Sequence, residues 1–311
     1  MNNGEKMHIN SIMLIMIIFS CMVLAIDTVS VKLGGFVHES IFATLHILQL
    51  AIVVLLIVFK KVDILKMYKL KNISRKLVFI SFAAGLLVMF LTSSIEQLLN
   101  AKIIGSTGTD DFSVNFTWIF ILLFAGFIAP IIEEIEFRGL LFGKLQDRNR
   151  ISISAIILVS FMFMILHTGE IHISAMILSI VSCIMYFYTR NLLYSSIAHF
   201  SGNIFLVIML FIVMILERTT DAVKVSEETD YIQGISYFSL FIEVFLLIAL
   251  IAFVVHYCRK FKAMDSDYSL ESSDNGNNVF TSISSRVLFT IEFLVYTIIC
   301  VYSTYILIKY K

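Results

Sequence analysis

The sequence predicts an all-α fold, a polytopic transmembrane helix bundle of about eight or nine spans. Two observations lead to this prediction. Hydrophobic residues make up 59% of the 311 positions and charged residues only 15%, with a mean hydropathy of +0.93, whereas a soluble protein of this size needs far more polar surface. The apolar residues also gather in runs of roughly 20, the length of α-helix that crosses a bilayer. We therefore expect the lipid bilayer to surround most of the chain.

The apolar runs place the expected spans in order along the chain. They cover 10–27, 40–59, 78–98, 114–145, 151–167, 171–188, 192–216, 235–258 and 286–309. The segment 263–285 is rich in Ser, Asn and Asp, which is typical of a flexible loop. We divide the chain into N-terminal transmembrane helices (1–113), a core that contains the intramembrane charges (114–216), and C-terminal transmembrane helices with a cytoplasmic loop (217–311).

Loop charges predict the orientation of the spans. The segment 60–76 is rich in Lys and Arg, which favours the cytoplasmic side, and 217–234 is rich in Asp and Glu. Counting spans from these loops places the N-terminus in the cytoplasm and the C-terminus outside. The abundance of Ile, Lys and Asn, with a single proline, indicates a bacterial protein. We therefore expect a multi-pass protein of a bacterial plasma membrane.

Net charge and cysteine spacing argue against binding to nucleic acid and against disulfides or a thiolate metal site. The formal net charge is zero, so nothing indicates binding to nucleic acid. The four cysteines all lie in apolar runs and none forms a Cys-x-x-Cys motif. We therefore expect neither a disulfide framework nor a thiolate metal site.

One stretch, 129–139, concentrates charge within an apolar span: Ala-Pro-Ile-Ile-Glu-Glu-Ile-Glu-Phe-Arg-Gly. Ionisable residues in a membrane span are functional candidates because burying them is costly. If the stretch is α-helical, Glu134 and Arg138 lie four residues apart on one face and can pair. Glu133 then points about 100° away and remains available for chemistry. Pro130, the only proline, predicts a kink or a fresh helix start just before the glutamates.

Two further motifs carry polar residues on later spans. Phe163 and His167 lie four residues apart, as do His199 and Asn203, so each pair shares one helix face. Helix rise places Glu133 and His167 roughly 20–25 Å from the cytoplasmic end of their helices. It places His199 and Asn203 roughly 13–20 Å from that end. A lone membrane histidine is often a core residue, and a lone asparagine often bonds a neighbouring helix. Their matched depth with the glutamates indicates chemistry instead.

Glu-Glu-x-x-x-Arg, Phe-x-x-x-His and His-x-x-x-Asn, in this order on successive helices, resemble the CPBP family. These are intramembrane endopeptidases that include CAAX proteases and bacteriocin-processing enzymes, also called the ABI family. The resemblance covers about 130–205 and implies that 114–216 is a catalytic core. Glu136 adds an acid inside the first motif.

The resemblance implies a role for each motif residue. Glu133 with His167 would position and deprotonate a water molecule, and His199 with Asn203 would stabilise the oxyanion. Glu134, Arg138 and Phe163 would support the site. The implied substrate is a membrane-associated or leader-bearing peptide, or a membrane protein.

The family is often classed as metalloendopeptidases, so zinc requires consideration. The chain has no His-Glu-x-x-His helix, yet one Glu and two His can form a three-ligand zinc site with an open position. The residues for such a site would be Glu133, His167 and His199. We expect metal-free, glutamate-assisted hydrolysis, with zinc as the alternative.

Two rival functions remain open at this point. The same fold can serve as a non-catalytic membrane immunity or scaffold protein. Intramembrane Glu and His also build the proton relays of transporters, although we find no pair of Gly/Pro-broken helices in matching halves.

Overall fold

A computed structural model describes residues 64–71, 73–103, 124–146, 150–167, 172–219, 237–264 and 283–310, with scattered positions between 13 and 54. All regular secondary structure in these ranges is helical, which confirms the predicted all-α fold. Of the expected spans at 10–27 and 40–59, only scattered positions are among the described residues.

The helices follow the predicted spans closely. They are α3 (Ile64–Met67), α4 (Arg75–Ile103), η1 (Phe124–Ile128), α6 (Ala129–Glu134), η2 (Ile135–Phe142), α7 (Gly143–Leu145), α8 (Ile153–Leu166), α9 (Ile173–Thr189), α10 (Leu192–Thr219), α12 (Tyr237–Met264) and α14 (Ile283–Tyr310). Among the described helices, α4, α10, α12 and α14 are long and apolar enough to cross a membrane, and α8 and α9 are apolar but shorter.

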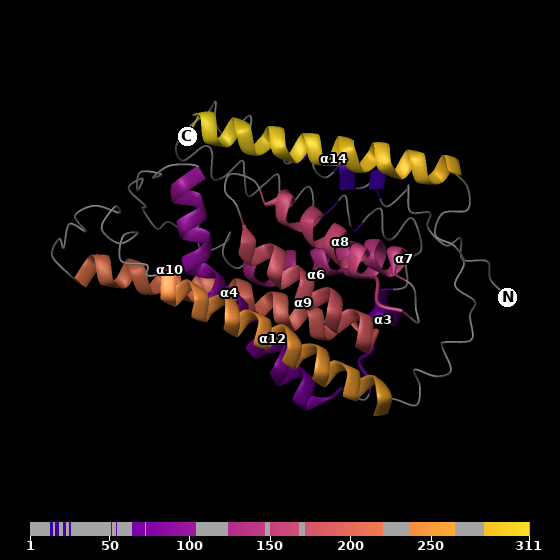
Figure 1. The fold of residues 1–311 in the computed structure, drawn as a ribbon, viewed down its shortest axis with the longest axis horizontal. Helices are drawn as coiled ribbons and strands as arrows, with labels where there is room; N and C mark the ends of the chain where they lie inside the picture. Colours follow the sequence, from indigo (N-terminus) through magenta and orange to yellow (C-terminus); the bar gives the residue numbers. More distant parts are fainter. Residues whose placement is uncertain are drawn as a thin grey trace.

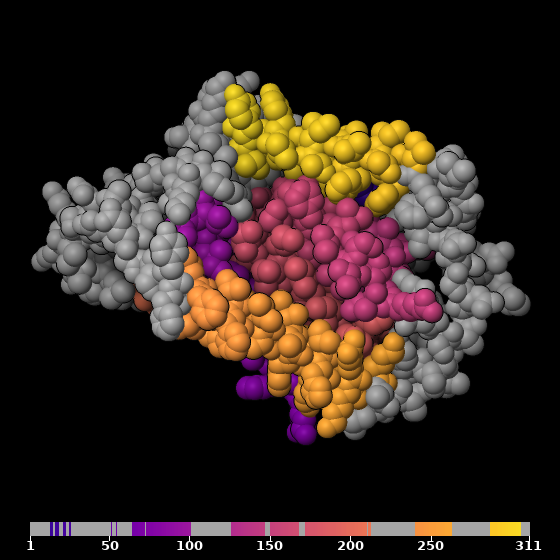
Figure 2. All heavy atoms as spheres, viewed as in Figure 1, coloured from indigo at the N-terminus to yellow at the C-terminus, as the bar shows by residue number. Residues whose placement is uncertain are grey.

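The helices surround a central group formed by α6, η2, α8 and α9. In Figure 1, α14 runs along one side of this group and α12 along the other, while α4 crosses near α10. The space-filling view shows the same order, with α14 and α12 framing the central helices (Figure 2). Large apolar side chains such as Phe241, Phe245 and Ile298 are exposed on α12 and α14. These outward faces suit contact with lipid tails.

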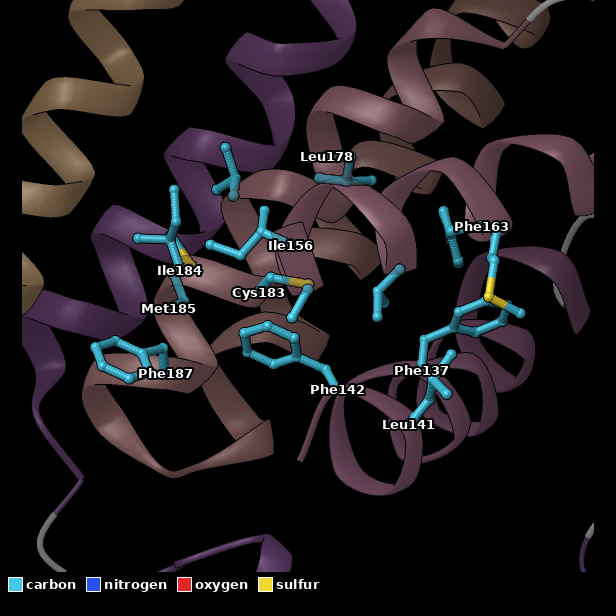
Figure 3. Packing of buried hydrophobic residues seen from close by; sticks show 14 of the residues in the cluster. Phe137, Leu141, Phe142, Ile156, Phe163, Leu178, Cys183, Ile184, Met185 and Phe187 are labelled. Carbon is cyan, nitrogen blue, oxygen red and sulfur yellow. The ribbon is translucent and has the colours of Figure 1, made fainter. Parts of the chain in front are cut away.

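The interior of the central group is apolar and tightly packed. Phe137 from η2 meets Phe163 from α8 edge to face, with ring centroids 5.0 Å apart, a favourable geometry for an aromatic pair. Phe142 and Cys183 belong to the same cluster, and their side chains gather in the interior in Figure 3. All four cysteines carry free thiols, in agreement with the expectation from their spacing.

Helices α4 and α10 pack against each other more closely than larger residues would permit. A Cβ atom added to Gly85 would overlap the carbonyl oxygen of Ala198 and the Oγ atom of Ser201. Small residues allow this kind of close backbone approach between membrane helices. The contact fixes the part of α10 that carries His199, so α4 serves as a support for the ionisable residues.

The segment before α4 is tied to the start of α10 by hydrogen bonds. The Asn191 side chain accepts from the backbone N–H of Lys69 at 3.2 Å and donates to its carbonyl at 2.9 Å. The Tyr194 hydroxyl accepts from the backbone N–H of Ser74 at 3.0 Å, and the Tyr68 hydroxyl lies 2.8 Å from that of Ser196. These bonds hold the segment against the helix that carries His199 and Asn203.

Candidate active site

The charged stretch does not form one continuous α-helix, so the expectation of an α-helical stretch is wrong in its second half. α6 ends at Glu134 and the chain continues as the π-helix η2, preceded by a π-helical turn, η1. Pro130 lies in the first turn of α6, where η1 passes into the α-helix, and Ile128 before it already has helical φ and ψ. The expected change in the helix at the proline is therefore a change from π to α geometry and not a fresh start. π-Helical segments often occur at functional sites.

Glu134 is a fully buried acid with two partners. Its Oε1 atom lies 2.9 Å from Nη1 of Arg138, and neither side chain is exposed. The same oxygen lies 3.1 Å from Nδ1 of His199. Because a carboxylate oxygen only accepts, Nδ1 of His199 carries the hydrogen. The predicted Glu134–Arg138 pair is therefore present, and it extends to a histidine on α10.

Glu133 approaches the other nitrogen of the same histidine. Its Oε2 atom lies 3.5 Å from Nε2 of His199, and its side chain is 18% exposed, in contrast to fully buried Glu134. His199 therefore lies between two consecutive glutamates, with one facing each ring nitrogen. The structure thus separates a shielded acid from an accessible one, as the helix geometry predicted.

The Phe163 ring lies at the centre of the predicted residues. Its centroid is 4.9 Å from the centroid of His167 and 5.3 Å from that of His199. The guanidinium carbon of Arg138 lies 4.6 Å from the same centroid, a cation–π distance. All three sequence motifs therefore meet at this buried ring. A phenylalanine here separates the two histidines and gives both an apolar wall.

His167 ends helix α8, and its tautomer follows from one contact. Nδ1 lies 2.9 Å from the carbonyl oxygen of Phe163, which can only accept, so Nδ1 holds the hydrogen. Nε2 then carries a lone pair and can accept a hydrogen bond from water. Sequence reasoning had paired His167 with Glu133, whereas the ionisable group that the structure places beside Glu133 is His199.

Asn203 lies one turn after His199 on α10 and is half-buried. The neighbouring Gly202 keeps that turn close to Met89 of α4 and Leu178 of α9, each 3.2 Å from where a Cβ would stand. The predicted i, i+4 relationship on a single helix is therefore confirmed.

Glu136 is a further acid inside the protein. Its side chain is 3% exposed, and its Oε1 atom has no hydrogen-bond partner among the described residues. Buried carboxyl groups without partners are rare because their desolvation is not compensated. It lies three residues after Glu133 and adds another buried acid to this stretch.

Sequence reasoning missed one pair of residues at the edge of this site. Glu96 from α4 lies 3.1 Å from Nδ1 of His172, and the ring centroid of His172 lies 5.8 Å from that of His167. A signal was available, since Glu96 is the only charged residue in the apolar run 78–98. Its partner lies 76 residues away, so no local spacing connects the two.

The ligands that zinc would need do not come together as a set of three. Within the described part of the chain, no group of three His, Cys, Asp or Glu side chains has metal-binding geometry. Glu133 and His199 are close, and both histidines use Nδ1 for other hydrogen bonds, which leaves Nε2 as the nitrogen that a metal could bind. The side chains of Glu133, His167 and His199 do not come together as one set of ligands in the described structure, and we derive no step through a metal.

Comparison with known families finds one match. Residues 115–205 match the model of the Rce1-like type II CAAX prenyl endopeptidases. This segment contains all three motifs and is less than a third of the chain. The match supports the CPBP/CAAX protease resemblance. No curated protein and no solved structure matches the chain.

Proposed function

Because residues 115–205 match the Rce1-like type II CAAX prenyl endopeptidases, we propose that this protein is an intramembrane endopeptidase. It hydrolyses a peptide bond of a membrane-associated or leader-bearing peptide. The observation that carries the proposal is the place of Glu133, an accessible carboxylate beside a histidine whose other nitrogen is held by buried Glu134. A general base needs this combination of access and fixed surroundings.

Glu133 acts as the base in the first step. Its carboxylate takes a proton from a water molecule, and the resulting hydroxide attacks the carbonyl carbon of the scissile bond. The Nε2 lone pair of His167 accepts the second hydrogen of that water and orients it. The protonated carboxyl group of Glu133 then gives this proton to the leaving nitrogen as the C–N bond breaks. The products are a carboxylic acid and an amine, which exchange a proton to become a carboxylate and an ammonium ion, and Glu133 is again ionised.

His199 and Asn203 stabilise the oxyanion of the tetrahedral intermediate. Nδ1–H of His199 is held by Glu134 at 3.1 Å, which fixes the ring plane. Because a carboxylate oxygen faces each ring nitrogen, we propose that His199 carries a hydrogen on both nitrogens. The Nε2–H has only a loose 3.5 Å approach to Glu133, so little is lost when it donates to the oxyanion instead. The Asn203 amide, one turn along, supplies the second donor. Preorganised donors of this kind stabilise developing charge without reorganisation.

The surroundings favour this chemistry by excluding water. The Phe163 ring covers one side of both histidines, and the apolar cluster of η2, α8 and α9 lies behind it. Low polarity around a charge strengthens every electrostatic interaction in the site. We further propose that the substrate enters from the cytoplasmic side of a bacterial plasma membrane, as the loop charges predict.

The test is cleavage by the purified full chain in lipid vesicles. The substrates are two sets of fluorescent peptides, one anchored by a prenylated C-terminal cysteine and one carrying an apolar leader. Glu133→Gln keeps the size of the side chain and removes the base, so we expect a loss of about 10²–10⁴ in rate. Glu292→Gln removes a carboxylate from helix α14, outside the three motifs, and serves as the matched control.

Two outcomes would overturn the proposal. One is cleavage by folded Glu133→Gln at the rate of the unchanged protein. The other is a folded protein that cleaves no peptide from either set, together with a Glu133→Gln variant that still protects cells or supports assembly as the unchanged protein does. That second result would favour the immunity or scaffold alternative.

A further inference from the structure

We propose that Glu96 and His172 are positioning residues that hold the ring of His167 in its active tautomer. This inference rests on the proposed function, because His167 is the group that orients the attacking water. It assigns a purpose to a second glutamate–histidine pair outside the three sequence motifs.

The position of Glu96 is fixed by two hydrogen bonds from another part of the chain. Its Oε1 atom accepts from Nδ1 of His172 at 3.1 Å, and its Oε2 atom accepts from the backbone N–H of Ser174 at 2.8 Å. Both carboxylate oxygens are thus engaged, so the side chain has one orientation.

Ser174 lies in the first turn of α9, where backbone N–H groups have no partner within the helix. The N-cap residue of α9, His172, makes no capping bond with its own side chain. Glu96 therefore caps α9 from a different helix, and the positive end of the helix dipole stabilises its charge. The cap places His172 at a defined point between α4 and α9.

His172 in turn contacts His167. The two ring centroids are 5.8 Å apart with the planes at 62°, an edge-to-face arrangement. His167 follows the last residue of α8, so its backbone is not enclosed by a further helical turn. Its ring is positioned by Phe163 and His172. Without His172, one of these two ring neighbours is lost.

The consequence concerns the hydrogen on His167. The bond from Nδ1 to the Phe163 carbonyl at 2.9 Å requires a particular ring orientation. A ring that rotates away loses this bond and exchanges its hydrogen between the two nitrogens, which removes the Nε2 lone pair for part of the time. Glu96 and His172 therefore act on catalysis through His167 and do not contact the reacting atoms.

Three variants test the positioning role in the full chain in vesicles. His172→Ala removes the ring contact, and we expect kcat to fall by up to about 100-fold with KM nearly unchanged. His172→Phe retains the ring contact but loses the hydrogen bond to Glu96, and we expect it to recover part of the rate. Glu96→Gln weakens the hold on His172 and gives an intermediate kcat. Glu292→Gln is again the matched control.

Double variants separate positioning from simple capping. If Glu96 acts through His172, adding Glu96→Gln to His172→Ala lowers kcat no further, because the two residues act in series. A purely structural pair would instead lower the melting temperature while the folded fraction keeps its kcat. Wild-type kcat in His172→Ala would overturn the inference.

A measurement independent of activity keeps the inference decidable if the proposed function fails. Nitrogen-15 NMR of labelled histidines reports which ring nitrogen carries hydrogen, and the His167 signal is identified by its loss in His167→Gln. We expect the single Nδ1–H form in the unchanged protein, a mixture of forms in His172→Ala, and a smaller share of the second form in His172→Phe. An unchanged tautomer in His172→Ala overturns the positioning role, whereas absence of any Glu133-dependent cleavage overturns only the protease proposal.

Discussion

Oε1 of Glu134 lies 3.1 Å from Nδ1 of His199, and both side chains are buried. This contact joins the end of α6 to the middle of α10 through a charged pair that solvent does not reach. The same oxygen also meets Arg138 at 2.9 Å, so one buried acid balances a guanidinium and orients a histidine. Its two roles predict that stability and activity change together when it is replaced.

Breaking the Glu134–Arg138 pair should destabilise the protein. Glu134→Ala leaves a buried guanidinium without its counter-charge, which we expect to cost about 3–5 kcal/mol. The double variant Glu134→Ala with Arg138→Met removes both charges and should recover much of this loss. Unfolding by denaturant in detergent micelles measures both effects. Equal destabilisation by the single and double variants would contradict the pair's assigned role.

The close contact between α4 and α10 predicts that Gly85 does not accept a side chain. Gly85→Ala places a methyl group against the backbone of Ala198 and the hydroxyl of Ser201. Overpacking of this kind typically costs about 1–3 kcal/mol, and here it also displaces the turn of α10 that carries His199. We expect a lower melting temperature together with reduced cleavage.

Gly126→Ala provides the matched control for that variant. Among the described residues, no atom lies within 4 Å of the position that a Cβ atom at Gly126 would take. This variant should keep the melting temperature and the cleavage rate of the unchanged protein. If it is as damaging as Gly85→Ala, steric overlap is not the reason for the loss.

Removal of an oxyanion donor should lower kcat and leave binding almost intact. Asn203→Ala deletes one amide donor, and loss of such a donor costs on the order of 10²–10³ in kcat. Leu206→Ala changes an outward-facing residue on the same helix and should keep the rate. Steady-state kinetics in vesicles measure the two variants. A rise in KM with unchanged kcat for Asn203→Ala would place that side chain in substrate binding instead.

Tyr68 predicts a loss of stability at alkaline pH. It lies between α3 and α4, outside the candidate spans. Burial raises its pKa to about 12, although its hydrogen bond with Ser196 acts in the opposite direction. In the unfolded chain the tyrosine releases this proton near pH 10. The contribution of Tyr68 to the free energy of unfolding is therefore fully present below pH 10 and is lost as the pH rises towards 12.

Tyr68→Phe checks this dependence. At neutral pH the variant lacks the 2.8 Å bond to Ser196 and should be less stable by about 0.5–1.5 kcal/mol. Between about pH 10 and pH 12 the unchanged protein should lose part of that advantage, since only it titrates there. Unfolding free energies measured across this interval test the point. Parallel pH profiles for the two proteins would show that the hydroxyl does not titrate as expected.

Metal removal should leave activity unchanged. Glu133 and His199 approach each other, yet no three-ligand set forms in the described part of the chain. We therefore predict that dialysis against a chelator preserves cleavage and that mass spectrometry finds no stoichiometric zinc. Stoichiometric zinc that leaves together with activity would instead establish the alternative ligand set that the sequence permitted.

The helix positions could be predicted from the sequence because each apolar run is bounded by polar residues. α8, α9 and α10 begin and end within a few residues of the runs 151–167, 171–188 and 192–216. Helix rise predicted a similar depth for Glu133, His167 and His199, but rise does not say which helix faces pack, so the contact of Glu133 with His199 was not predicted.

Other features had no local signal. The π-helical conformation of η2 could not be predicted from its sequence. Its eight residues are mostly apolar, and their pattern does not distinguish backbone hydrogen bonds between residues five apart from those between residues four apart. The pairing of Glu96 with His172 depends on how α4 packs against α9, and periodicity within one helix carries no information about that packing.

The π-helical form of η2 has a consequence for changes in chain length. A π-helix bonds residues five apart, so it accommodates a surplus residue relative to an α-helix. Deletion of one residue between 135 and 142 would let the segment tighten into an α-helix without interrupting the backbone. The helices on either side would then keep about the same rotation relative to each other, because the π-helix had accommodated the surplus residue. A deletion in a purely α-helical segment has no such compensation and rotates the residues on its two sides by about 100°, so η2 is where this helix best tolerates a change in length.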